Sequence, residues 1–155
     1  MFEEYVSAFE GIGRPVGLML LDLDKFKNVN DTFGHGVGDE VLKAVAGCLS
    51  EFARHHDVVA RLGGEEFAIV VTNMSGQGLV SFAERIRRAV SALTIRVGDV
   101  TLPITVSVGL ASSAPGDDCA GIFKRADINL YSAKQGGRNR VHAGAGSGIP
   151  AGTNA

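Results

Sequence analysis

The sequence contains few of the residues that disulfide, metal–thiolate or nucleic-acid chemistry would require. Only 2 of its 155 residues are cysteines. Cys48 and Cys119 lie in apolar surroundings without a CxxC pair, so we interpret both as small buried hydrophobic residues. The chain has 15 basic and 17 acidic side chains and a net charge of -2. It therefore lacks the basic excess expected of a protein that binds a nucleic acid polymer.

Long apolar runs are also absent. The run VGLMLL at 16–21 is far shorter than the roughly 20 residues needed to cross a bilayer. The acidic, amphipathic start MFEEYVSAFE is unlike a secretory signal. We therefore predict a cytoplasmic domain without membrane contact of its own, either alone or within a membrane-anchored parent. The length suits one globular domain with a real core.

The strongest strand pattern is VGLMLLD at 16–22. It is apolar on both alternating faces, which predicts a central strand covered on both sides and delivering Asp22 at its end. Two further apolar runs, 57–62 and 65–71, flank Gly63-Gly64 and predict a hairpin with those glycines as its two-residue turn.

The rest of the chain predicts a mixed α+β fold with a mostly antiparallel sheet. Apolar side chains recur at helical spacing over the ranges 2–9, 37–52, 78–92 and 118–135. The β-rich stretches 94–100 and 102–113 are joined too closely for a crossover, so we predict that they are antiparallel to each other. A short last strand is predicted at 138–142. We predict one domain over 1–142 and a flexible Gly/Ala-rich tail over 143–155.

Three segments together closely resemble the GGDEF family, the diguanylate cyclases that make cyclic di-GMP from two GTP. They are LDLDKFKNVNDTFGHGVGD at 21–39, RLGGEEF at 61–67 and ADINLYSAKQGGRNRV at 126–141, in the family's order and spacing. The resemblance implies a palm-like fold, similar to ferredoxin and nucleotidyl cyclase domains, with a central, mainly antiparallel sheet flanked by helices.

The carboxylates of these segments suit phosphoryl transfer. Attack of a ribose 3'-hydroxyl on an α-phosphate develops negative charge, which divalent cations held by carboxylates stabilise. The resemblance implies that Asp22, the Leu23 carbonyl and Glu65 hold Mg²⁺ or Mn²⁺. Adjacent strand residues point to opposite faces, so Glu65 and Glu66 cannot both be equivalent metal ligands. The resemblance implies that Glu66 lies close by as a second ligand or a helper. The alternative for this glutamate pair alone is a solvated hairpin tip.

Several residues are expected to bind the triphosphate. Gly63 and Gly64 can adopt the positive φ of a tight turn and let the backbone approach a phosphate. The free N–H groups of Lys25 and Phe26 at the start of a helical turn suit anions, with Lys27 adding charge. The resemblance also assigns Lys134 and Arg138 to the triphosphate; by themselves they read as cations at a helix C-terminus.

Asn30 and Asp39 are implied by the resemblance to select the base. A carboxylate accepts hydrogen bonds from the N1–H and the amine of guanine, a donor pair that adenine lacks, so GTP is favoured over ATP. The alternative for Asp39 is a helix cap or a first-turn acid.

Arg54 and Asp57 have the RxxD spacing of the family's inhibitory product site. An arginine fork suits the N7 and O6 acceptors of guanine, and an aspartate suits its N1 and N2 donors. Arg85 is the position of a second arginine in some members.

One chain carries one copy of each element, whereas cyclic di-GMP needs two phosphodiester bonds. We therefore expect a two-fold homodimer in which each copy presents one GTP. The family's DxLTGLxNR-like segment is missing, which predicts an N-terminally truncated domain of a longer parent with linked regulatory domains. A GTP- or cyclic di-GMP-binding module without turnover is the alternative function.

Overall fold

The computed structural model describes residues 14–144. The main sheet has five strands in the order β2-β3-β1-β6-β7. The central strand β1 (Val16–Leu23) is antiparallel to β3 (Glu66–Thr72) and to β6 (Val106–Ser112). Strand β2 (Val58–Gly63) is antiparallel to β3, and β7 (Arg140–His142) lies parallel to β6. The predicted α+β fold with a mainly antiparallel sheet is confirmed.

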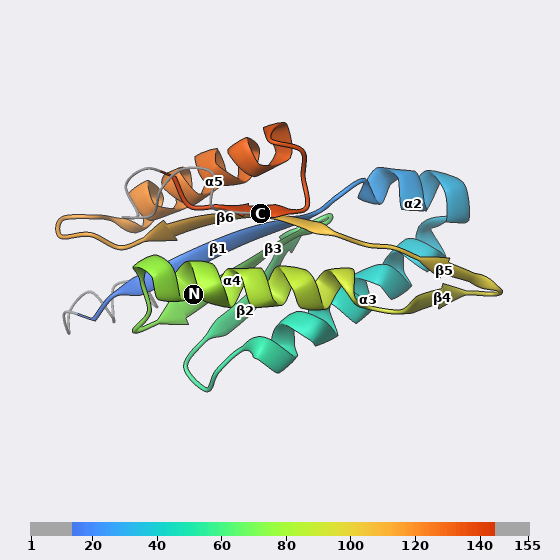
Figure 1. The fold of residues 1–155 in the computed structure, drawn as a ribbon, viewed down its shortest axis with the longest axis horizontal. Coiled ribbons are helices and arrows are strands. Elements are labelled where there is room, and N and C mark those ends of the chain that lie inside the picture. Colours follow the sequence, from blue (N-terminus) through green and yellow to red (C-terminus); the bar gives the residue numbers. More distant parts are fainter. Residues whose placement is uncertain (1–13, 145–155) are drawn as a thin grey trace.

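Helices cover both faces of this sheet (Figure 1). Helices α3 (His35–Phe52) and α4 (Gly76–Ser91) pack on one face together with the short helix α2 (Phe26–Phe33). Helix α5 (Cys119–Gln135) packs on the other face. All eight residues of β1 are buried, which confirms the predicted central strand: Met19 and Leu21 face α3 and α4, whereas Leu18 and Leu20 face α5.

Gly109 determines how closely α5 approaches β6. A Cβ built at this position would lie 2.2 Å from both the Ala126 carbonyl oxygen and the Leu130 nitrogen of α5. The helix backbone therefore rests directly on the strand backbone, as only a glycine permits. This contact fixes the height of α5, and of the residues that follow it, above the sheet.

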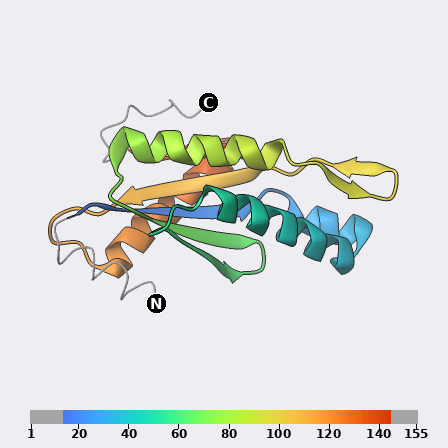
Figure 2. The ribbon, with the colours of Figure 1, turned by 90° about the horizontal axis from the view of Figure 1, so that it is seen from below.

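The prediction for 94–113 is wrong in its pairing. Strands β4 (Ile95–Val97) and β5 (Val100–Leu102) pair with each other in a separate two-stranded hairpin. Gly98, at φ 59°, supplies the turn inside the segment that we read as one strand. Figures 1 and 2 show this hairpin projecting at the end of the molecule where α2 lies.

The predicted turn at Gly63-Gly64 is wrong by one residue. A register shift between Arg61 and Gly63 lets Gly63 pair with Glu66, so Gly64 and Glu65 form the turn. The predicted helix at 2–9 and all of the predicted tail 143–155 except Ala143 and Gly144 lie outside the described residues. Among those residues, no helix is long and apolar enough to span a membrane.

Candidate functional site

Asp22 and Glu66 are direct partners across the antiparallel ladder of β1 and β3. Such partners project their side chains to the same face of a sheet. Glu65 precedes Glu66 in the turn, where its carbonyl accepts a 3.2 Å hydrogen bond from the Leu23 nitrogen. The fold therefore brings together the strand-end aspartate and the hairpin glutamates that the sequence singled out.

The surroundings of Asp22 and Glu66 disfavour the charged form of both carboxylates. Burial raises the pKa of Asp22, which is 6% exposed, against the lowering effect of Lys134. Burial also raises the pKa of Glu66, and the neighbouring Asp22 carboxylate raises it further. Carboxylates gathered at the cost of mutual repulsion are typical of functional sites.

Lys134 compensates part of this charge. Its Nζ lies 2.5 Å from Asp22 Oδ2, which joins the last turn of α5 to the end of β1. The prediction placed Lys134 on the triphosphate, and the structure adds an ion pair with a proposed metal ligand. An incoming cation and Lys134 would thus compete for the same carboxylate oxygen.

The donor set fits a Mg²⁺ or Mn²⁺ ion shared with a substrate. Within residues 14–144 no group of three or more His, Cys, Asp or Glu side chains is arranged to hold a metal. Mg²⁺ commonly takes only one or two protein carboxylates and completes its shell with phosphates and water. Asp22 and Glu66, with Glu65 beside them, provide such a partial set.

Both glycines of the hairpin have positive φ, 146° at Gly63 and 51° at Gly64. No atom lies within 4 Å of a Cβ built at either position, so the backbone conformation rather than lack of space favours glycine. Arg61, which sequence reasoning missed, donates to the Gly64 carbonyl at 2.9 and 2.7 Å and holds the turn.

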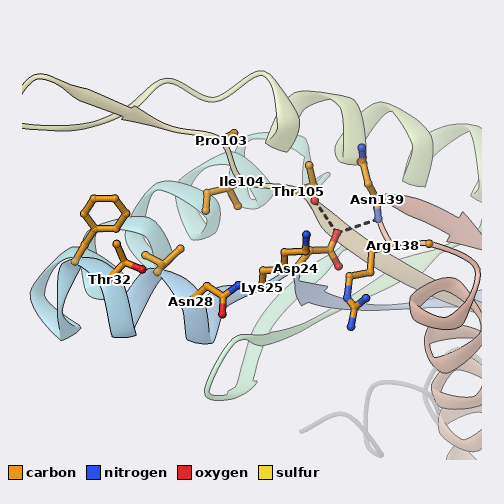
Figure 3. A pocket seen from close by; sticks show the side chains of 12 residues that line it. Asp24, Lys25, Asn28, Thr32, Pro103, Ile104, Thr105, Arg138 and Asn139 are labelled. Atoms are coloured by element: carbon orange, nitrogen blue, oxygen red, sulfur yellow. Dashed lines mark hydrogen bonds between the residues drawn. The ribbon is translucent and has the colours of Figure 1, made fainter.

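The start of α2 is open to an anion. Lys25 precedes it in the left-handed conformation, no side chain caps its first N–H groups, and its first turn carries no acid. Lys27 is exposed on the same turn. Lys25 and Arg138 line one cavity of about 490 Å³ (Figure 3). Lys25 and Arg138 thus share one site, whereas the other predicted triphosphate residues Phe26, Lys27 and Lys134 do not line this cavity.

Asn30 carries an unsatisfied acceptor. Its Oδ1 is the one buried side-chain nitrogen or oxygen without a hydrogen-bond partner in the described part of the chain. A Cβ on Gly38 would lie 1.9 Å from this atom, so Asn30 is packed against the residue that precedes Asp39. Helix α3 begins at His35 and has no acid in its first turn, which rules out the capping alternative for Asp39. Asp39, the residue after Gly38 in α3, is exposed.

Arg54 and Asp57 are bonded to each other rather than free. Two guanidinium nitrogens of Arg54 donate to the Asp57 carboxylate at 2.9 and 3.2 Å. Both side chains also hold Thr72, through its carbonyl at 2.6 Å and its nitrogen at 3.2 Å. Thr72 and Glu66 end the same strand, roughly 20 Å apart at the usual rise per residue. This pair therefore lies at the far end of β3 from the carboxylate cluster.

Arg85 lies beside the same pair through aromatic side chains. Its guanidinium carbon is 5.7 Å from the ring centroid of Phe52, and that of Arg54 is 5.9 Å from the centroid of Phe82. The two rings pack edge to face at 6.5 Å. The three residues predicted for product binding are thus gathered around the C-terminal end of α3 and the middle of α4.

Asp24 is a site residue that sequence reasoning missed. It follows Asp22 by two positions, and its carboxylate accepts hydrogen bonds from Thr105, Ser107 and the Asn139 nitrogen. Arg138 and Asn139 have φ of 64° and 43°, a left-handed backbone that costs non-glycine residues on the order of 1–3 kcal/mol each. The sequence signal that could have identified Asp24 is its spacing of two residues from Asp22 in the motif DLD.

Comparison with known proteins agrees with this geometry. Residues 2–140 match the family described as "Diguanylate cyclase, GGDEF domain". Diguanylate cyclase A of Treponema denticola is 40% identical over 127 residues, which are 81% of this chain and 34% of that protein. Response regulator PleD of Caulobacter vibrioides is 42% identical over 132 residues, 83% of this chain and 29% of that protein. The chain spans about a third of these curated relatives.

Solved structures with the same fold include two that bear on the site. The GGDEF domain of DgcB from Caulobacter crescentus, in complex with c-di-GMP, superposes with a TM-score of 0.87 and 36% identity over 92% of this chain and 85% of that one. The active GGEEF domain of a diguanylate cyclase from Vibrio cholerae has a TM-score of 0.85 and 34% identity, with 92% and 90% covered.

Proposed function

Since the chain belongs to the GGDEF domain family of diguanylate cyclases, we propose that it condenses two GTP into cyclic di-GMP and two pyrophosphates. The observation that carries the proposal is the ladder pair of Asp22 and Glu66, two crowded carboxylates at the end of the sheet with Lys134 against one of them. Each bond forms when a ribose 3'-oxygen attacks an α-phosphate and pyrophosphate departs.

Asp22, the Leu23 carbonyl, Glu65 and Glu66 are the groups that would hold Mg²⁺ or Mn²⁺. Bound there, the metal would offset the negative charge that develops on the phosphate oxygens. The ladder geometry gives Glu66 at least as strong a claim as Glu65, because Glu66 faces Asp22 directly whereas Glu65 lies in the turn.

The remaining residues bind the nucleotide. The first N–H groups of α2, at Lys25 and Phe26, with Lys27, Lys134 and Arg138, neutralise the triphosphate, and the turn of Gly63 and Gly64 lets the backbone approach it. The exposed carboxylate of Asp39 accepts from guanine, and Asn30 accepts once its unsatisfied Oδ1 turns out of its buried position against α3. Guanine supplies the two donors, N1–H and the N2 amine, that these acceptors need.

A second copy of the chain completes the site in this proposal. On α5, Asp127 acts on the charge of Glu66 and Lys134 binds Asp22. Tyr131 lies between these two residues on the same helical stripe and is 64% exposed, with the neighbouring Ile128 at 53%. Two exposed apolar side chains, Ile128 and Tyr131, beside half a reaction centre suit contact with a two-fold related partner.

The activity test uses purified protein with GTP and Mg²⁺, both as the free chain and fused to a parallel coiled coil that forces dimerisation. We expect cyclic di-GMP, with higher yield from the fusion. Glu65→Gln and Glu66→Gln should each abolish product, while Glu40→Gln on the exposed surface of α3 should not. A forced dimer that makes no cyclic di-GMP would refute the proposed activity.

The pair of Arg54 and Asp57 supports a second function, binding of cyclic di-GMP as an inhibitor with help from Arg85. Their closed geometry requires the ion pair to open when guanine binds. Calorimetry with cyclic di-GMP and GTP separates the alternatives, because a module without turnover would bind nucleotide and yield no product in the forced dimer. We also propose that the parent protein carries linked regulatory domains, as the length of the relatives suggests.

A further inference from the structure

The loop that carries Arg138 is fixed at its backbone while its side chain is left free. The Arg138 nitrogen donates to the Ala133 carbonyl at 3.0 Å, and the Arg138 carbonyl accepts from Arg140 Nε at 3.1 Å. Within residues 14–144 the Arg138 guanidinium has no hydrogen-bond or ion-pair partner, and it borders the cavity at the start of α2. Such a side chain is aimed by its backbone rather than by contacts of its own.

Asp24 connects this loop to the central strand. Its nitrogen donates to the Thr105 carbonyl at 2.9 Å, which extends the pairing of β1 beyond the ladder. Its Oδ2 accepts from the Asn139 nitrogen at 2.9 Å and from Thr105 Oγ1 at 2.7 Å. Its Oδ1 accepts from the buried Ser107 hydroxyl at 2.6 Å. Figure 3 shows Asp24 between Thr105 and Asn139 with Arg138 beside them.

These contacts separate the role of Asp24 from that of Asp22. Both oxygens of Asp24 face protein donors that hold the carboxylate against the start of β6. The Asn139 side chain is held from the other side, because Arg87 donates to its Oδ1 at 2.8 Å and is itself bound to Glu84. Asp24 therefore secures one side of a loop whose left-handed residues need support.

We propose that Asp24 is a positioning residue for Arg138. It holds Asn139 in place, so that the preceding guanidinium faces the triphosphate at the start of α2, and it does not itself touch nucleotide or metal. The inference rests on the proposed function, because it takes Mg²⁺–GTP as the ligand. It predicts that Asp24 contributes to GTP binding only while Arg138 is present.

The test is a double-mutant cycle on GTP binding. Asp24→Ala and Arg138→Ala should each weaken Mg²⁺–GTP binding by about tenfold, and the double variant should bind no more weakly than Arg138→Ala alone. The KM for GTP should rise more than kcat falls. Asp24→Asn should stay within about threefold, because its amide oxygen still accepts from Asn139 and its NH₂ group can donate to Ser107.

Folding controls keep the test decisive. If Asp24→Ala melts early, Thr105→Val replaces it, since this variant removes one support of the carboxylate with little change of shape; its smaller loss must also vanish when Arg138 is absent. Multiplying effects of Asp24 and Arg138 would overturn the inference alone. GTP binding without product in the forced dimer would overturn the proposed activity alone, and absence of GTP binding by the unsubstituted domain would overturn both.

Discussion

Asp22 on β1 and Glu66 on β3 face each other across the ladder, and the charge of Asp22 disfavours the charge of Glu66. The pairing is fixed by the register of two buried strands, so the repulsion cannot relax by moving one residue aside. This relationship makes the end of the sheet a place where stability and ligand binding oppose each other.

Glu66→Gln should raise the stability of the metal-free domain near neutral pH. Burial first, and Asp22 second, raise the pKa of Glu66. A carboxyl with a raised folded-state pKa stabilises the fold fully below its unfolded pKa and loses that contribution as pH rises through the folded value. Because Glu66 is exposed and solvent screens its charge, we expect only a small gain in thermal melts with a chelator, at most about 1–2 °C, which shrinks toward about pH 4. A lower melting temperature at neutral pH would contradict this account.

As the pH is lowered, metal affinity should begin to fall at a higher pH than it would for carboxylates with ordinary pKa values. The pKa values of Asp22 and Glu66 are both raised, mainly by burial, and both groups must lose their protons to bind a cation. Titration of Mn²⁺ by calorimetry should show affinity declining well above pH of about 4. Glu66→Gln should make this dependence shallower, and an affinity that stays constant down to about pH 4 would exclude these ligands.

Lys134→Met should weaken the fold and strengthen binding of the bare metal. It leaves the Asp22 carboxylate, 6% exposed, without its partner. The lysine is itself one-third exposed, so the cost should be about 1–3 kcal/mol rather than that of a fully buried pair. Denaturant unfolding measures the loss, and Mn²⁺ titration should show tighter binding. GTP binding should weaken, since a triphosphate cation is gone.

Gly38→Ala should weaken GTP binding while Gly36→Ala should not. Both residues lie in the first turn of α3. A Cβ added at Gly38 would meet Asn30 Oδ1, whereas a Cβ added at Gly36 would have no atom within 4 Å. We expect Gly36→Ala to stabilise the helix by up to about 1 kcal/mol. Gly38→Ala should displace Asn30 and reduce GTP affinity by about tenfold in calorimetry. Equal effects of the two variants would remove Asn30 from base recognition.

Arg54→Ala and Asp57→Ala should each relieve product inhibition and lower stability, because Arg54→Ala leaves the buried Asp57 carboxylate without its cationic partner. The Asp57 side chain is fully buried and holds Arg54 and the Thr72 nitrogen, while the Arg54 side chain is 44% exposed. Removing a buried, hydrogen-bonded carboxylate should cost about 1–3 kcal/mol. Initial rates with added cyclic di-GMP, together with melting curves, check both halves. Undiminished inhibition in Arg54→Ala would place the inhibitory site elsewhere.

The sequence predicted most elements because their patterns are local. The buried run at 16–22 and the helical stripes of α3, α4 and α5 need no knowledge of partners. The wrong predictions concern the position of a turn within a segment and the pairing of strands, which helical or strand periodicity does not reveal. Gly98 turned one expected strand into half a hairpin, and the bulge after Arg61 moved a turn by one residue.

The site residues follow the same division. Motif spacing singled out Asp22, Glu66 and Lys134, but their mutual arrangement comes from strand register and from the seating of α5. Asp24 escaped notice because its partners, Thr105 and Asn139, are 81 and 115 residues away in the chain. Only the fold shows that its carboxylate is already occupied by the protein.

Gly109 has no side chain, yet it controls the position of the charged residues at the end of α5. Because α5 rests directly on its backbone, a single added methyl group would act as a spacer under the whole helix. Lys134 would be lifted from Asp22, and the loop after α5 would leave Asp24. The chemistry at the edge of the sheet thus has a mechanical tolerance set by a residue that has no side chain and touches no substrate.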